Sequence, residues 1–294
     1  MAACRPGLAL LTLLAFTAAA DDGGRLSLWQ VDGDANRVYL LGSIHVLRES
    51  DHPLPPGLDA AYDDAEALYM ELDFDDLDAA ADQATIAELA FITDGSSLGD
   101  WLGADAWQRA GELAADARVP LSMLERTEPW FAAINVELMI LTRLGYTQEH
   151  GIENTFAARA ARDDKEIYGF ETTRQQLGFL DGLSRDAQRE LLLSTLEEGV
   201  RLGEIMQGLI DAWRIGDTEY LQRELLDDMQ TMSELHDVIV VNRNRAWANA
   251  IDELLDDDRD YLVIVGALHL VGREGVPALL AGRGHRVVQL RSQH

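Results

Sequence analysis

Two similar stretches of sequence decide the fold: VYLLGSIHV at residues 38–46 and LVIVGALHL at residues 262–270. Each begins with a continuous apolar run, which is typical of a strand buried on both faces of a sheet. Each run continues into the pattern G-x-x-H and one more aliphatic residue. Because ligands bind beyond the carboxyl ends of parallel strands, the repeat predicts that His45 and His269 lie together at a functional edge. The alternative is a pair of core histidines bonded to the backbone.

Further strand signals extend this sheet. Residues 67–72 form another apolar run. Residues 26–31 and 37–41 flank an Asp-Gly-Asp turn, which predicts an N-terminal β-hairpin. Residues 166–170 and 286–290 are shorter strand candidates.

Helical periodicity dominates the middle of the chain. Apolar residues recur there at three- and four-residue spacing, which predicts helices at residues 79–91, 104–117, 130–144, 185–213, 218–232 and 233–255. The predicted fold class is therefore α/β, with a central, mostly parallel sheet flanked by helices, an N-terminal β-hairpin and a large helical insertion. No linker-like composition divides the chain, so we expect residues 21–294 to form a single domain.

The charge balance excludes one class of partner. Asp and Glu number 52 against 24 Lys and Arg, a formal net charge of −28, while the hydrophobic fraction of 47% is that of a globular protein. Binding to a nucleic-acid backbone requires clustered positive charge. Nucleic acid is therefore not an expected partner.

The N-terminus predicts export. Residues 1–20 combine Arg5, a short apolar run and a small-residue cleavage pattern, as in a secretory signal peptide. An uncleaved anchor is the alternative. The expected location is periplasmic or secreted, with no stable membrane span after cleavage. Cys4 is the only cysteine and lies in this leader, so disulfides and thiol catalysis are excluded from the mature protein.

Several charged residues stand where strands end or helices begin. Glu71 closes an apolar strand, so it is either an arginine partner or a carboxylate that activates water. Glu171 follows a short strand, and Glu153 follows Gly151. Both positions are also typical of a carboxylate that only stabilises a helix N-terminus. Arg243 could pair with a site carboxylate or bind an anionic substrate group, although a surface position on its helix is the commoner case.

Neither the remaining histidines nor the common catalytic and nucleotide-binding motifs indicate a different functional site. His52, His150, His236, His285 and His294 fall in predicted loops, helix ends or the terminus, where solvated or capping roles are expected. The chain contains no G-x-S-x-G, H-E-x-x-H, phosphate-binding loop or dinucleotide motif. Serine hydrolase, zincin, kinase and dinucleotide-dependent activities therefore have no support.

The order and spacing of short motifs resemble the TraB/GumN family of exported bacterial proteins, also grouped with pheromone-shutdown proteins. The matching pieces are LGSIHV at 41–46, LPP at 54–56, YMELD at 69–73, GIE at 151–153, GFET at 169–172 with Gln175 and Gln176, Arg243 with Asn244, GALHLVG at 266–272, and the segment 275–280 with Gly284 and Val287. The resemblance covers essentially the whole mature chain.

The resemblance implies a hydrolytic site. Animal relatives are membrane-tethered, Wnt-cleaving proteases that depend on divalent metal and use G-x-x-H histidines with glutamates. A wider superfamily is similar to erythromycin esterases, in which such a histidine acts as a base on water, and to haem-binding lipoproteins. Carried over, His45, Glu71 and His269 fall at the site, with Glu171 and Arg243 as supporting members.

The leading prediction is therefore an exported, metal-assisted hydrolase with a peptidase activity on a small-molecule or peptide substrate. His45, Glu71 and His269 would hold Mn²⁺, Co²⁺ or Zn²⁺, or the attacking water, with Glu171 beside them. The alternatives are a metal-free, esterase-like hydrolase with the same residues, and a non-catalytic periplasmic protein that binds a small molecule, peptide or haem. Nothing in the sequence decides the oligomeric state.

Overall fold

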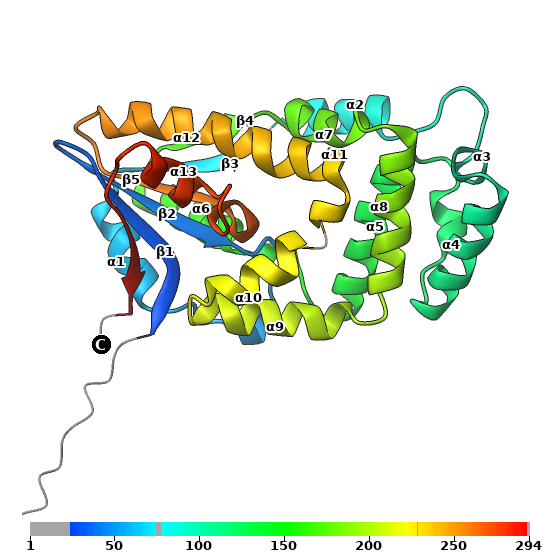
Figure 1. The fold of residues 1–294 in the computed structure, drawn as a ribbon, viewed down its shortest axis with the longest axis horizontal. Helices are drawn as coiled ribbons and strands as arrows, with labels where there is room; N and C mark the ends of the chain where they lie inside the picture. The colour runs from blue at the N-terminus through cyan, green and yellow to red at the C-terminus, as the bar shows by residue number, and fades with distance from the viewer. Residues whose placement is uncertain (1–23, 75–77, 228, 293–294) are drawn as a thin grey trace, which may run out of the picture.

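A computed structural model describes residues 24–74, 78–227 and 229–292. The predicted signal peptide lies outside these residues. Six strands form one mixed sheet in the order β4-β3-β5-β2-β1-β6, as Figure 1 shows. The strands are β1 (Arg25–Asp32), β2 (Arg37–Ser43), β3 (Ala67–Leu72), β4 (Ile167–Glu171), β5 (Tyr261–Gly266) and β6 (Val287–Arg291). The predicted α/β class is confirmed.

The strands β2, β5, β3 and β4 are parallel neighbours, whereas β1 pairs antiparallel with β2 and with β6. The predicted hairpin is the β1–β2 pair. β5 lies at the centre and all six of its residues are buried, as expected for a strand covered on both faces. The four parallel strands end at one edge, so the residues that follow them face a common region.

Thirteen α-helices are found in the described residues. They are α1 (Gly57–Asp64), α2 (Ala79–Leu89), α3 (Leu98–Leu102), α4 (Ala104–Asp116), α5 (Pro129–Arg143), α6 (Ile152–Asp163), α7 (Thr173–Asp181), α8 (Arg185–Glu198), α9 (Leu202–Arg214), α10 (Thr218–Gln222), α11 (Ser233–His236), α12 (Asn242–Leu255) and α13 (Val276–Gly282). None of them is long and apolar enough to cross a membrane.

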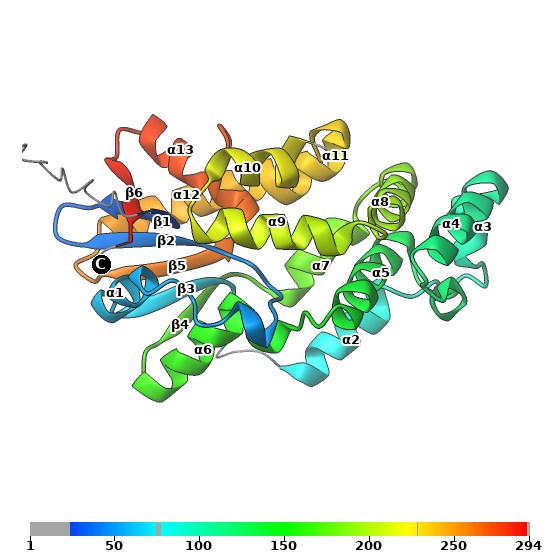
Figure 2. The same ribbon diagram turned by 90° about the horizontal axis from the view of Figure 1, so that it is seen from below.

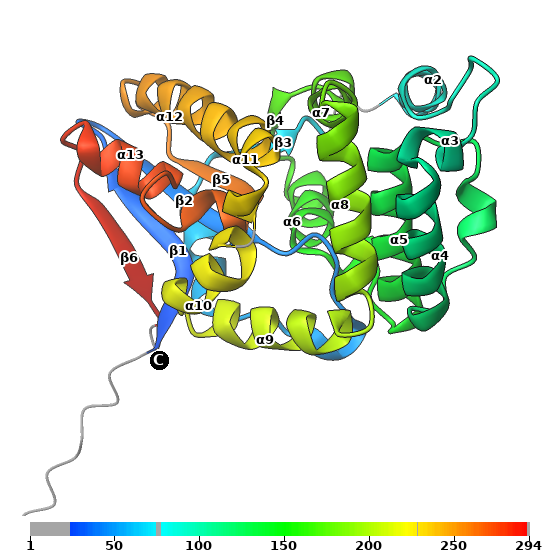
Figure 3. The same ribbon diagram turned by 45° about the vertical axis from the view of Figure 1, so that its right-hand side comes forward.

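The helices cover both faces of the sheet and extend beyond one edge. Figure 2 shows α12 and α13 on one face and α1 and α6 on the other. In Figures 1 and 3, α5 and α8 lie beyond the carboxyl ends of the parallel strands, with α3 and α4 farther out. The helical insertion thus stands directly opposite the edge at which the G-x-x-H segments emerge.

The single helix predicted over residues 185–213 is wrong: α8 and α9 are separate, with a break at 199–201. α8 packs against α5, whereas α9 packs against β1 and α10. A Cβ at Gly199 would lie 2.7 Å from Cδ1 of Ile140 on α5, so this end of α8 approaches its neighbour closely. Periodicity reports which face of a helix is apolar and not the direction of its axis.

The helices predicted over residues 218–232 and 233–255 are also less regular than their patterns indicate. α10 continues as a π-helical turn at Arg223–Asp227, and a second π turn at Asp237–Val241 joins α11 to α12. π turns shift the register of the helix that follows. The second one leads directly into the buried residues Arg243 and Asn244.

Candidate active site

The structure brings all five residues predicted for the site to the carboxyl edge of the sheet. His45 follows β2 by two residues, Glu71 lies near the end of β3, and Glu171 is the last residue of β4. His269 lies in a short 3₁₀ turn that follows β5 directly, and Arg243 reaches in from the first turn of α12. These residues come from five separate parts of the sequence.

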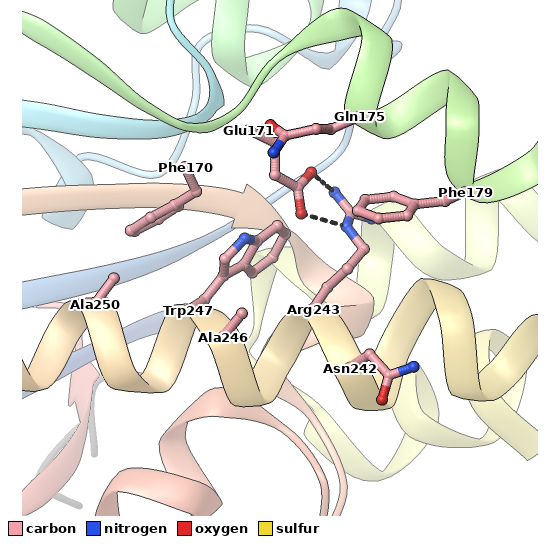
Figure 4. A pocket seen from close by; sticks show the side chains of 9 residues that line it. All are labelled: Phe170, Glu171, Gln175, Phe179, Asn242, Arg243, Ala246, Trp247 and Ala250. Carbon is pink, nitrogen blue, oxygen red and sulfur yellow. Dashed lines mark hydrogen bonds and ion pairs between the residues drawn. The ribbon is translucent and has the colours of Figure 1, made fainter.

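Arg243 is the centre of the cluster. Its Nη2 lies 2.6 Å from Oε2 of Glu71 and 2.8 Å from Oε2 of Glu171, and its Nε lies 2.8 Å from Oε1 of Glu171. Figure 4 shows the two-point contact with Glu171. The Arg243 side chain is only 8% exposed. The surface position considered for this arginine is therefore wrong, because α12 turns it toward two strand-end carboxylates.

Both carboxylate oxygens of Glu71 accept hydrogen bonds, and its environment favours the ionised form. Oε1 accepts from the Gly266 N–H at 2.8 Å, and Oε2 accepts from Gln176 at 3.1 Å as well as from Arg243. Burial alone would raise the pKa of Glu71, but His269 and Arg243 beside it lower the pKa to about 2. His269 is uncharged at neutral pH, so the cations that stabilise this carboxylate there are Arg243 and His45.

His269 is buried and fixed in one tautomer. The side chain is 1% exposed, and burial lowers its pKa to about 3. The amide of Asn244 donates to the Glu274 carbonyl, so its Oδ1 faces Nδ1 of His269 at 2.6 Å. Nδ1 therefore carries the proton, which leaves Nε2 to accept from Nη1 of Arg243 at 3.3 Å.

His45 differs from His269 in exposure and in charge. Its side chain is 60% exposed, and its Nδ1 lies 2.6 Å from Oε1 of Glu153. Ser43 donates its hydroxyl to the same Glu153 oxygen. The negative charge of Glu153 raises the pKa of His45 to about 10. Within the described part of the chain, Nε2 of His45 has no hydrogen-bond partner.

Glu153 is a further functional candidate, for which the sequence indicated only a carboxylate at a helix N-terminus. It does lie in the first turn of α6, as a helix-terminal carboxylate would, but it is buried and faces His45. Burial raises the pKa of Glu153, yet its contacts with His45 and Ser43 lower it overall. Its position in the motif GIE, one of the pieces that resemble the family, is the sequence feature that indicates a role at the site.

The candidate groups meet around Gly266, the last residue of β5. A Cβ placed on this glycine would lie 3.3 Å from Oε1 of Glu71, 3.5 Å from Cδ2 of His269 and 3.6 Å from Nε2 of His45. Glycine leaves this position free of side-chain atoms. The three side chains thus converge on Gly266, at the end of the central strand.

Gly151 fixes the position of the His45 segment, and its replacement gives a testable expectation. A Cβ at Gly151 would overlap the carbonyl oxygen of His45. Gly151→Ala is therefore expected to destabilise the protein by about 1–3 kcal/mol in urea unfolding. Gly111→Ala is the matched control, since nothing lies within 4 Å of that Cβ and the change is expected to be neutral or stabilising. Equal stability of the two variants would contradict the close packing.

A metal ion does not fit the predicted ligands as they are arranged. Both oxygens of Glu71 and both ring nitrogens of His269 already bond to protein groups, and the guanidinium of Arg243 lies between them. Among the described residues, no group of three His, Cys, Asp or Glu side chains could hold a metal ion. The divalent metal stays a prediction from the resemblance.

The other histidines lie outside this cluster. His52 bonds through Nε2 to the His150 carbonyl, and His285 bonds to Asp252. His236 is buried, with Nε2 3.6 Å from Oε2 of Glu274, so the solvated role expected for it is wrong. Gly272 and Glu274, which are distant in sequence, line the same pocket as His236. His294 lies outside the described residues.

Comparison with known proteins agrees with these landmarks. The chain is similar to proteins named "Uncharacterized protein YbaP" from Escherichia coli (strain K12) and Shigella flexneri. Each is 25% identical over 243 residues, which cover 82% of this chain and 87% of the relative. No solved structure matches. The TraB/PrgY/gumN family model matches residues 27–289, a span that includes every candidate site residue. The chain belongs to the TraB/PrgY/gumN family.

Proposed function

We propose that the protein is a hydrolase that splits an ester or amide bond with a water molecule held above Gly266. One observation carries the proposal: Glu153 holds His45 by Nδ1, while Nε2 lies beside Gly266, as Oε1 of Glu71 does. A histidine oriented by a carboxylate through one nitrogen and open at the other is the arrangement of a general base.

The proposed reaction uses groups of this chain alone. His45 Nε2 removes a proton from the water while the water oxygen attacks the carbonyl carbon of the substrate. Glu153 stabilises the imidazolium that forms, and His45 then returns the proton to the leaving oxygen or nitrogen. Glu71 accepts a hydrogen bond from the second O–H of the water, which stays on the attacking oxygen, and Arg243 and the Gly266 N–H keep this carboxylate ionised and in place.

A substrate screen tests the proposal. Chromogenic esters and short peptides are offered to the protein as purified, after treatment with a chelator, and with Mn²⁺, Co²⁺ or Zn²⁺ added. We expect hydrolysis that survives chelation. Hydrolysis that requires an added metal would support the metal-assisted alternative instead. Binding of a peptide or small molecule without turnover would support the non-catalytic alternative and contradict the hydrolase.

The pH dependence of the reaction provides a second test, through Glu153. Because only uncharged His45 can act as a base, activity is expected to rise with pH through its raised pKa, into the alkaline range. Glu153→Gln removes the negative charge, so the rising limb should move to lower pH and the maximal rate should fall by about 10²-fold. The other charges that act on His45 are Glu71, Arg243 and Glu137.

Glu149→Gln is the control for that experiment. Glu149 lies exposed in the turn that precedes α6 and belongs to none of the contacts around His45. Its replacement should leave the pH profile unchanged. A Glu153→Gln variant with the pH profile of the unmodified protein would show that Glu153 does not act on the base.

We further propose that the protein acts after export, in the periplasm or outside the cell, as one domain over residues 21–294. The leader-like residues 1–20 support this location. A peptide or small molecule is the proposed substrate. Fractionation of cells that produce the full chain, with N-terminal sequencing of the product, tests both the location and the cleavage point.

A further inference from the structure

A pocket lies beside the Arg243–Glu171 pair, between α7 and α12. It has a volume of about 280 Å³. Figure 4 shows its walls, which are the rings of Phe170, Phe179 and Trp247. Ala246 and Ala250, four residues apart on α12, form its floor. Pockets for whole drug-sized ligands measure roughly 300–1,000 Å³, so this one suits a single small group.

The walls of the pocket favour an uncharged, planar group. Arg243 and Glu171 neutralise each other, so neither offers a spare charge. The Arg243 guanidinium lies 5.7 Å from the ring centre of Phe179 and 4.6 Å from that of Trp247. Phe170 stacks on Trp247 with ring centres 5.6 Å apart. Ring faces of this kind attract another aromatic ring through offset or edge contacts.

Trp247 also carries an unsatisfied hydrogen-bond donor. The residue is 2% exposed, and its buried Nε1 has no hydrogen-bond partner among the described residues. Figure 4 shows this nitrogen on the side of the indole that faces Phe170 and Ala250, which are both pocket residues. Most buried N–H groups are paired, so an acceptor on a bound molecule would complete this one.

We infer that the pocket between α7 and α12 binds one uncharged aromatic ring that carries a hydrogen-bond acceptor. The ring lies among Phe170, Phe179 and Trp247, and its acceptor receives the Trp247 Nε1–H. Two sources share this chemistry: a free phenol-like molecule and a tyrosine side chain of a peptide. The inference does not depend on the proposed hydrolysis, because binding is measured without turnover.

The test is a titration followed by the indole N–H signals in a proton–nitrogen correlation spectrum. The protein has six tryptophans, and Trp247→Phe identifies the signal of Trp247 by its disappearance. p-Cresol represents the free molecule, and N-acetyltyrosinamide represents the peptide. We expect at least one of them to give a saturable shift of the Trp247 signal. The compound that binds more tightly identifies the source.

Filling the pocket provides the decisive comparison. Ala246 is exposed, so Ala246→Leu can place its larger side chain in the pocket without disturbing the core. We expect it to weaken binding by about tenfold or more. Ala115→Leu on α4, also exposed, is the control and should bind as the unmodified protein does.

Three results would overturn the inference. They are the absence of a saturable shift with both aromatic compounds, a shift that Ala246→Leu leaves unchanged, and equal binding of 4-methylcyclohexanol, which keeps the hydroxyl but lacks the aromatic ring. Loss of hydrolysis in any variant has no bearing on these binding results, so a failure of the proposed function is separately recognisable.

Discussion

Replacement of His45 by asparagine is expected to reduce kcat/KM by about 10³-fold or more on any substrate that the protein hydrolyses. The change removes Nε2, which lies beside Gly266. It keeps an amide N–H close to the place of Nδ1, so that Glu153 retains a donor. Because the His45 side chain is 60% exposed, little packing is lost, but buried Glu153 loses its cationic partner. The variant is therefore expected to be less stable, and activities are compared well below its unfolding temperature.

His285→Asn is the matched control for this prediction. His285 also bonds to a carboxylate, with Nε2 2.6 Å from Oδ1 of Asp252, but it lies outside the candidate site. Its variant should keep full activity. If His45→Asn folds normally and also keeps full activity, His45 is not the base. If the two variants lose activity equally, the loss does not arise from the site.

Replacement of Arg243 by methionine is expected to destabilise the protein by about 3–5 kcal/mol, the largest effect on stability that we predict. The change leaves Glu71 and Glu171 without their shared cation, although their side chains are only 13% and 8% exposed. Two buried carboxylates would then repel each other, and the hydrogen bonds from Gln176 and the Gly266 N–H carry no full positive charge to offset this. Urea unfolding at neutral pH measures the loss.

The pH dependence of that loss follows from the carboxylates. In the unmodified protein the pKa of Glu71 is lowered to about 2, so the stability it contributes is present above its ordinary pKa of 4.5 and disappears as the pH falls toward 2. Without Arg243, burial raises the pKa of Glu71 instead. The deficit of Arg243→Met should therefore shrink as the pH falls from 7 toward 5 and protonation relieves the repulsion.

A second substitution and a control complete this experiment. Glu171→Gln in the Arg243→Met background removes one of the two charges and should recover part of the lost stability. Arg159 also bridges two carboxylates, those of Asp59 and Asp63, but on the surface. Arg159→Met should cost at most about 1 kcal/mol. A similar loss in both arginine variants would show that the Arg243 cluster is not especially dependent on its cation.

Sequence patterns were sufficient for the parts of the site that follow strands. The apolar runs before Gly42 and Gly266 predicted buried parallel strands, and the rule that parallel strands end at one edge placed His45 and His269 there. The same reasoning placed Glu71 and Glu171. These predictions succeeded because a strand fixes where its next residue emerges, whatever lies elsewhere in the chain.

Partners that come from distant helices were beyond this reasoning. Glu153 is 108 residues from His45 along the chain, and its own pattern indicated only a helix terminus. The sequence favoured a surface position for Arg243. In the structure α12 follows a π turn and packs with this side chain facing inward. A helical pattern specifies an apolar face, but it does not specify which distant group that face will meet.

The sequence by itself therefore determined the α/β class, the strand-end candidates His45, Glu71, Glu171 and His269, and the family. Only the tertiary structure decided their protonation. It buries His269 beside Arg243, which keeps that imidazole neutral, and it places Glu153 against His45, which favours the charged form. The two histidines share one sequence pattern and differ in chemistry, because a pKa depends on burial and on the charges that folding brings close.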